Sequence, residues 1–150
     1  MKQFLFFLIP LFSFSQEAIE GIIIHDDLER EYILYIPESY SGEDAVPLVL
    51  NLHGYTSNAG EQMIYSNFFE VSDTEGFLLV HPMGTVGLDG EPFWNSWETE
   101  DVDDVGFLSS LIDYLGTEYN IDFNRVYSTG MSNGGYMSYT LACRLSEKIA

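Results

Sequence analysis

The sequence has few cations, a single cysteine and no apolar run as long as a membrane span. Five Lys and Arg residues face 24 Asp and Glu residues in 150, which gives a formal net charge of −19. A surface this negative repels phosphate backbones and anionic lipids, so we expect neither a nucleic-acid partner nor a stable membrane anchor. Cys143 has no partner for an intrachain disulfide, and we expect it to be a small buried residue on a helix.

The N-terminal segment has the pattern of a cleavable secretory signal. A short positive start is followed by residues 4–14, which are apolar apart from one proline and one serine. This run is shorter than the roughly 20 residues that span a bilayer. Small residues at Ser13 and Ser15 predict cleavage before Gln16. We therefore expect residues 1–15 to be a signal peptide and the mature protein to be secreted, into the periplasm or the extracellular space.

The sequence also lacks a recognisable metal-binding pattern. No pair of its three histidines stands at metal-ligand spacing, so no metal or other cofactor is expected. One dense acidic group could offer carboxylates to calcium, but its spacing does not match an EF-hand loop. We expect that group to be a solvated loop leading into a helix. Its members are Glu98, Glu100, Asp101, Asp103 and Asp104.

Strand-like and helix-like segments alternate after Gln16, and 46% of the residues are hydrophobic, which suits one packed domain. The order predicts an α/β fold with a mostly parallel sheet, helices on both faces and an antiparallel hairpin at the N-terminal edge. The predicted strands are residues 19–25, 31–36, 48–52, 77–80 and 125–128. The predicted helices are residues 61–73, 136–148 and a segment that is capped by Asp103 or Asp104 and ends near 119.

A glycine-flanked serine stands between a predicted strand and a predicted helix. The run Gly-Met-Ser-Asn-Gly at residues 130–134 matches G-x-S-x-G, the tight turn that lifts a serine above a sheet at a helix N-terminus. The turn needs small residues on either side of the serine. Serine is a weak nucleophile unless a base takes its proton and donors hold the developing oxyanion. The pattern predicts that Ser132 is a nucleophile.

Two backbone N–H groups are candidates for the oxyanion hole of that serine. One belongs to Asn133, the residue after the nucleophile. The other is expected from a loop after an earlier strand, and His53-Gly54-Tyr55 follows the predicted strand at residues 48–52. We therefore expect Tyr55 to supply the second donor.

Three segments together resemble the secreted polyhydroxybutyrate-depolymerase and feruloyl-esterase-like family. They are Leu-His-Gly at residues 52–54, Val-Asp-Asp-Val-Gly-Phe-Leu at 102–108, and the stretch at 125–135 that ends in Gly-Met-Ser-Asn-Gly-Gly. The resemblance covers most of the chain from about residue 20. It implies an α/β-hydrolase fold, a Ser-His-Asp triad with Ser132 as nucleophile, and carboxylic-ester substrates. It also implies that His53 is structural and that its turn belongs to the oxyanion hole.

The acid and the base of the triad have no candidates in the expected order. In α/β-hydrolases the acid and then the histidine follow the serine along the chain. After Ser132 the sequence offers only Glu147, on the helix that leads away from the site, and no histidine. His81, which precedes the serine, is expected to be a positioned residue at a strand end. We therefore expect the sequence to be the N-terminal part of a longer catalytic domain, with the acid and histidine beyond Ala150, and to be neither well folded nor fully active alone.

The long loop at residues 83–100 is a candidate for substrate binding. Trp94 and Trp97 could stack on a sugar ring or a feruloyl group, or could pack over the domain as a hydrophobic cover. Feruloyl, acetyl and hydroxyalkanoate esters all remain open as substrates, on a polysaccharide or in a polyester. A peptidase of the same fold and a non-catalytic secreted binding protein are the alternatives, and a metal hydrolase is a more distant one.

Overall fold

A five-stranded sheet organises residues 18–150, the part of the chain that this computed structural model describes. The predicted signal peptide lies outside the described residues. The strand order is β1-β2-β4-β3-β7, in which β3 pairs in parallel with β4 and β7, and the β1–β2 hairpin adds antiparallel strands at one edge. The expected architecture is thus confirmed. The bounds are β1 (Ala18–His25), β2 (Leu28–Tyr35), β3 (Val46–Leu52), β4 (Leu78–Pro82) and β7 (Ile121–Gly130).

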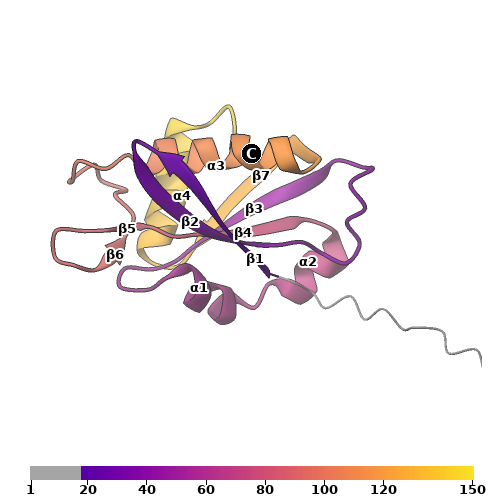
Figure 1. The fold of residues 1–150 in the computed structure, drawn as a ribbon, viewed down its shortest axis with the longest axis horizontal. Coiled ribbons are helices and arrows are strands. Elements are labelled where there is room, and N and C mark those ends of the chain that lie inside the picture. The colour runs from indigo at the N-terminus through magenta and orange to yellow at the C-terminus, as the bar shows by residue number, and fades with distance from the viewer. Residues whose placement is uncertain (1–17) are drawn as a thin grey trace, which may run out of the picture.

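Helices cover both faces of this sheet (Figure 1). On one face lie α1 (Ala59–Ser66) and α2 (Phe69–Glu75), and on the other lie α3 (Asp104–Glu118) and α4 (Asn133–Arg144). Alternate residues of a strand point to opposite faces. One face of β3 therefore packs its leucines under α3 and α4, in a core that includes Leu48, Leu50, Leu52, Phe107, Leu111, Met137 and Leu141.

Two helices differ from their predicted extents, and one predicted burial is wrong. The single helix predicted at 61–73 is divided because Asn67 adopts a left-handed conformation, with φ of 47°, and ends α1. Asparagine tolerates this conformation better than most residues. The last helix begins directly after Ser132 and ends at Arg144, earlier than predicted. Cys143 is exposed on that helix, contrary to the expectation of a buried thiol.

The loop at residues 83–100 contains a small hairpin of its own. Its strands are β5 (Thr85–Val86) and β6 (Pro92–Phe93), and it extends from the left of the sheet in Figure 1. The N–H of Thr56 donates to the Pro92 carbonyl at 2.9 Å. The hairpin therefore supports the turn that follows β3.

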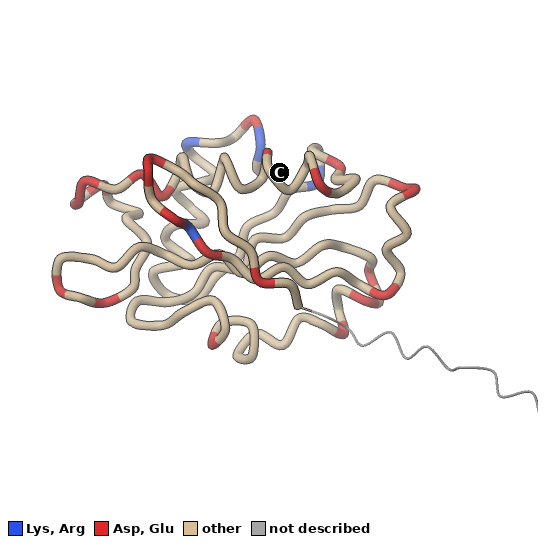
Figure 2. The backbone as a smooth tube through the Cα atoms, viewed as in Figure 1, with Lys and Arg blue, Asp and Glu red and all other residues tan. Residues whose placement is uncertain are grey.

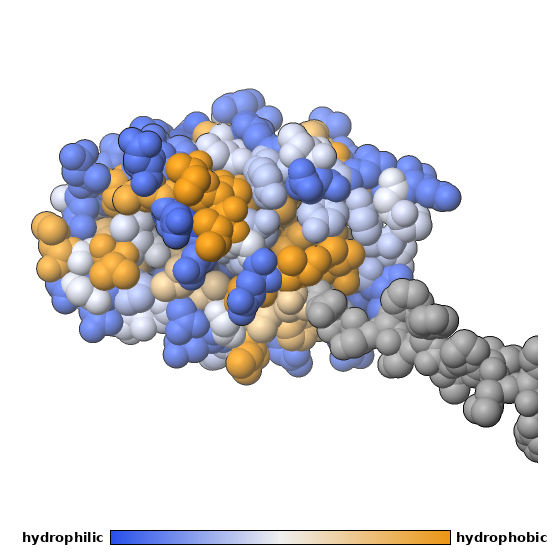
Figure 3. Space-filling model, viewed as in Figure 1, coloured by the Kyte–Doolittle hydropathy of each residue, from blue (hydrophilic) through white to orange (hydrophobic). Residues whose placement is uncertain are grey.

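Acidic residues are spread around the periphery, mostly in turns and near element ends (Figure 2). Apolar side chains gather on the front face where β1 and β2 lie (Figure 3), and Ile22 and Ile24 of β1 are 54% and 64% exposed. None of the described helices has the length and apolar character needed to cross a bilayer.

A buried ion pair connects the hairpin to α3 and to the long loop. Nη2 of Arg30 donates to Oδ1 of Asp104 at 2.5 Å, and the two residues are 4% and 1% exposed. The guanidinium also lies 3.8 Å from the centre of the Phe107 ring. The other carboxylate oxygen of Asp104 accepts the N–H of Asn95 at 2.7 Å. The expectation of a solvated acidic loop is therefore wrong for Asp104, which is a buried partner of an arginine distant in sequence.

Helix α4 packs closely against the sheet because glycines stand at the contact. A Cβ on Gly134 would overlap the Leu52 carbonyl oxygen and lie 2.6 Å from the His53 carbonyl oxygen. A Cβ on Gly130 would lie 2.7 Å from the Leu52 oxygen. The obstructing atoms are backbone atoms at the end of a central strand and in the turn after it, which cannot move aside as a flexible side chain can.

Gly134→Ala is expected to destabilise the protein by about 2–3 kcal/mol, because overpacking against fixed atoms forces strain or backbone shifts. Gly135→Ala is the matched control, since its Cβ would lie 3.3 Å from the Gly130 oxygen and helix propensity favours alanine. Urea unfolding of the full-length variants measures both. Equal stability of Gly134→Ala and Gly135→Ala would contradict the packing argument.

His81 lies inside β4 and is fully buried. Neither ring nitrogen has a hydrogen-bond partner within the described residues. Burial penalises the charged ring and lowers the pKa of His81 from 6.5 to about 4. The folded protein therefore holds this histidine neutral at pH values where the unfolded chain protonates it.

The neutral state of His81 is expected to make stability depend on pH. The unfolded chain binds the extra proton below pH 6.5 and the folded chain only near pH 4, so this stability is present above 6.5 and is lost between 6.5 and 4. The loss amounts to roughly 3 kcal/mol. His81→Leu should flatten this part of the profile when unfolding free energies are measured at pH 7.5 and 4. Identical pH profiles for the variant and the natural protein would refute the assignment.

Candidate active site

Ser132 occupies a sharp turn where β7 ends and α4 begins. It is the N-cap residue of α4, is exposed, and has φ of 51° and ψ of −112°. A non-glycine residue with positive φ carries backbone strain, which persists only where the surroundings impose it. The strained turn raises the serine side chain above the carboxyl end of the parallel strands, where ligands of open α/β sheets bind.

Neighbouring backbone groups hold this turn in place. The N–H of Met131 donates to the Leu52 carbonyl at 3.1 Å, and the N–H of Gly134 donates to the Met131 carbonyl at 2.9 Å. Together with the close glycine contacts to β3, these hydrogen bonds fix the turn on both sides of the serine. The strain at Ser132 is thus compensated by the packing of α4 on the sheet.

The turn after β3 lies directly against the serine turn. A Cβ on Gly54 would be 3.8 Å from Ser132 Cβ and 3.0 Å from Met131 Cε. Within residues 18–150, the backbone N–H groups of Tyr55 and Asn133 have no hydrogen-bond partner. The structure therefore brings together the two segments that the sequence predicted to act together, with two N–H groups available for an anionic oxygen.

His53 holds the first of these segments with both ring nitrogens. Nδ1 lies 2.7 Å from the Gly54 carbonyl, and Nε2 accepts the N–H of Gly84 at 2.9 Å. Since Nε2 accepts a hydrogen bond, the proton of the neutral ring is on Nδ1. Burial lowers the pKa of His53, although the Gly54 hydrogen bond opposes the shift. The ring has no free nitrogen for Ser132, so its role is to position the turn.

Trp94 lies beneath the site and does not reach solvent. It is fully buried, and its indole N–H donates to the His53 carbonyl at 3.0 Å. The ring centres of Trp94 and His53 are 5.1 Å apart. Stacking on a substrate does not fit this position. A packing role does, although Trp94 packs beneath the site and not as the expected cover over the domain.

The side chain of Asn133 fixes the backbone of Trp94. Oδ1 of Asn133 accepts the Trp94 N–H at 2.6 Å, and Nδ2 donates to the Trp94 carbonyl at 2.9 Å. The sequence pattern assigned a role only to the backbone of Asn133. The amide side chain could have indicated this second role. A primary amide both donates and accepts hydrogen bonds, so it can pair with the N–H and the carbonyl of one residue.

Trp97 and Tyr136 form an exposed aromatic pair near the serine turn. Trp97 is 69% exposed, Tyr136 is 53% exposed, and their ring centres are 5.5 Å apart. The Ser96 carbonyl accepts the hydroxyl of Thr140 at 3.1 Å, which fixes this part of the loop on α4. Tyr136 is four residues after Ser132, and the sequence did not single it out because its contact with Trp97 joins α4 to a loop distant in sequence.

No described side chain serves Ser132 as a base. Within residues 18–150, Ser132 Oγ has no hydrogen-bond partner. His53 is held by Gly54 and Gly84, and His81 is buried inside β4. His25 lies at the end of β1, in the turn region of the first hairpin. The described residues therefore supply an exposed serine beside two backbone N–H groups without partners, and the sequence-based expectation of an acid and a histidine beyond Ala150 stays a prediction.

Known proteins match most of this chain. The family model described as esterase PHB depolymerase matches residues 30–150. A bifunctional acetylxylan esterase/xylanase of Neocallimastix patriciarum is 32% identical over 121 residues, which are 81% of this chain and 17% of that protein. Feruloyl esterase B of Piromyces equi is 30% identical over 122 residues, which are 81% of this chain and 23% of that protein. The chain thus spans less than a quarter of the length of either relative.

Solved structures show the same fold at lower identity. A ferulic acid esterase superimposes with a TM-score of 0.73 and 17% identity, over 91% of this chain and 56% of its own. The acetyl xylan esterase from Aspergillus awamori gives a TM-score of 0.66 and 19% identity, over 81% of this chain and 44% of its own. The chain therefore has the α/β-hydrolase fold that the sequence predicted, and it belongs to the esterase PHB depolymerase family.

Proposed function

We propose that the protein is a serine hydrolase of carboxylic esters, with Ser132 as its nucleophile. The observation that carries the proposal is the strained turn at Ser132, with φ of 51°, packed against a turn that has a free backbone N–H. An exposed serine with no structural hydrogen bond and a costly backbone conformation needs a reason to be there, and nucleophilic catalysis provides one.

The reaction begins when Ser132 Oγ attacks the ester carbonyl carbon and loses its proton to a base. The base is the histidine that the family resemblance implies, carried by a part of the protein outside residues 18–150. The N–H groups of Tyr55 and Asn133 stabilise the oxyanion of the tetrahedral intermediate. The alcohol then leaves with a proton, and water hydrolyses the acyl-enzyme by the same steps. Each oxyanion donor contributes on the order of 10²–10³-fold to the rate.

The acyl or alcohol part of the ester is proposed to contact the aromatic pair of Trp97 and Tyr136. An exposed, fixed aromatic surface can stack on a feruloyl ring or on the apolar face of a sugar. The two named relatives are an acetylxylan esterase and a feruloyl esterase. We therefore propose a feruloyl or acetyl ester on a polysaccharide as the substrate, ahead of a hydroxyalkanoate polyester.

Such a substrate is outside the cell, which agrees with the signal peptide proposed for residues 1–15 and with cleavage before Gln16. Residues 16–150 are proposed to be the N-terminal part of the catalytic domain. The abundance of acidic residues does not oppose this function, because feruloyl and acetyl esters and the aromatic surface are all uncharged.

Ser132→Ala in the full-length protein is expected to lower ester turnover by on the order of 10⁴-fold or more and to abolish labelling by a fluorophosphonate probe. Ser138→Ala removes a serine hydroxyl from α4, the helix that Ser132 caps, and should leave ester turnover and probe labelling unchanged. Labelling that survives Ser132→Ala would eliminate this serine as nucleophile. If the protein cleaves peptides and not esters, the alternative of a peptidase of the same fold is favoured. If the natural protein is not labelled by the probe, the alternative of a non-catalytic binding protein is favoured.

Trp97→Ala is expected to raise the KM for methyl ferulate roughly 2- to 10-fold, because one aromatic contact is worth about 0.5–1.5 kcal/mol. The kinetics on methyl acetate, which has no ring to stack, should stay the same. Tyr139→Ala is a control, since Tyr139 is an aromatic residue of α4 that is 78% exposed and is not part of the pair formed by Trp97 and Tyr136. An equal effect of Trp97→Ala on both esters would argue against stacking.

A further inference from the structure

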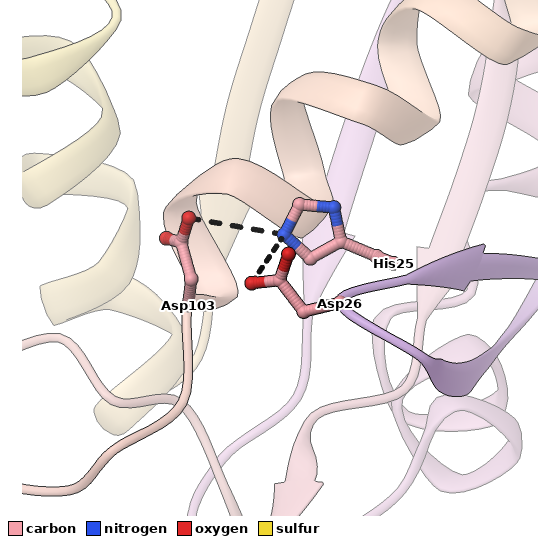
Figure 4. A group of neighbouring side chains, drawn as sticks. All are labelled: His25, Asp26 and Asp103. Atoms are coloured by element: carbon pink, nitrogen blue, oxygen red, sulfur yellow. Dashed lines mark ion pairs between the residues drawn. The ribbon is translucent and has the colours of Figure 1, made fainter.

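Three side chains with metal-binding atoms converge where the β1–β2 hairpin meets the start of α3 (Figure 4). His25 is the last residue of β1, Asp26 begins the turn, and Asp103 is the N-cap of α3. Nε2 of His25 lies 3.6 Å from Oδ2 of Asp26 and 3.8 Å from Oδ2 of Asp103. One nitrogen of the His25 ring and one oxygen of each carboxylate thus face a common point.

One ring nitrogen of His25 is oriented by a neighbouring hydroxyl, and the other faces the two carboxylates at ion-pair distance without a hydrogen bond (Figure 4). Its Nδ1 lies 3.2 Å from the hydroxyl oxygen of Ser110, which fixes the ring. Its Nε2 is buried and has no hydrogen-bond partner within the described residues. Both carboxylate oxygens are beyond the roughly 2.7–3.2 Å of an N–H···O hydrogen bond. A buried polar atom without a partner is rare and unfavourable, and an ion is one of its regular explanations.

The two aspartates are also held so that one oxygen of each remains available. Oδ1 of Asp103 caps α3 by accepting the Gly106 N–H at 2.8 Å, which leaves Oδ2 toward His25. Asp26 has φ of 50°, in a tight turn that brings it beside the strand end. Gly106 keeps the space open, because a Cβ there would overlap Asp103 Oδ2 and lie 2.9 Å from His25 Nε2.

The spacing and the charge fit a single cation. The ligand atoms all lie within 4.8 Å of one another, whereas ligands of a tetrahedral ion bound at about 2.0–2.1 Å are about 3.4 Å apart. The adjoining hollow is lined by further acids, Glu98, Glu100 and Asp101. The two arginines of that hollow already pair, Arg30 with Asp104 and Arg144 with Glu98.

We propose that His25, Asp26 and Asp103 bind one divalent transition metal ion of the zinc type, with water at the remaining coordination position. An imidazole ligand favours zinc over calcium or magnesium, which prefer oxygen ligands alone. The ion would join the first hairpin to the N-terminus of α3, so its effect is on stability. The site uses none of the residues assigned to ester hydrolysis and does not depend on that proposal.

Calorimetric titration of the metal-free, full-length protein tests the site. Zn²⁺ should bind with one high-affinity site per chain and raise the Tm, and Mg²⁺ and Ca²⁺ at the same concentration should do neither. His25→Gln, Asp26→Asn and Asp103→Asn should each weaken Zn²⁺ binding at least 10-fold. The two asparagine variants suit their positions, because asparagine also caps helices and tolerates a left-handed backbone.

Asp27→Asn is the matched control. Asp27 follows Asp26 in the same turn, has φ of 61° and loses the same charge, but it is not one of the three ligands. Zn²⁺ affinity within 2-fold of the natural protein is expected for it. The proposal is overturned if Zn²⁺ does not bind, if Ca²⁺ binds more tightly, or if Asp27→Asn weakens binding as much as Asp26→Asn does. Ester turnover, measured in parallel, reports separately on the catalytic assignment.

Discussion

The buried carboxylate of Asp104 is the contact on which the arrangement of the site depends. One oxygen meets the guanidinium of Arg30 at 2.5 Å, and the other meets the N–H of Asn95 at 2.7 Å. Removing one partner from such a pair leaves an uncompensated buried charge, which is far more costly than losing a surface ion pair. From Asn95 the chain passes directly to Trp94, whose indole and backbone contact His53 and Asn133. The hairpin, α3 and both halves of the site are thereby connected.

The sequence predicted the parts of the site that local chemistry determines. The turn at Ser132 follows from glycines at fixed spacing between a strand and a helix, because only glycine fits where Gly130 and Gly134 approach the Leu52 carbonyl. The mostly parallel sheet with helices on both faces follows from the alternation of strand-like and helix-like segments. The cap of α3 follows from an aspartate before an apolar face, although the sequence alone did not distinguish Asp103 from Asp104.

Contacts between distant segments were not predictable in the same way. Arg30 and Asp104 are 74 positions apart, so nothing local shows that this acid, among several neighbours, is the buried one. Trp94 and Trp97 lie in the same irregular loop, yet one is fully buried and the other is 69% exposed. Hydrophobic periodicity is absent there, so it could not distinguish them. The end of α1 was missed for a different, local reason, because it depends on the left-handed backbone of the single residue Asn67.

The edge strand β1 has a consequence for how copies of this protein behave in concentrated solution. Within the described residues β1 pairs on one side only, and it exposes Ile22 and Ile24. An unpaired edge with apolar side chains is a template for contact between molecules. A net charge of −19 opposes that contact by repulsion over about one Debye length, roughly 10 Å at 0.1 M salt. This repulsion weakens as ionic strength rises or as the carboxylates become protonated, so contact between exposed edges becomes more favourable under those conditions.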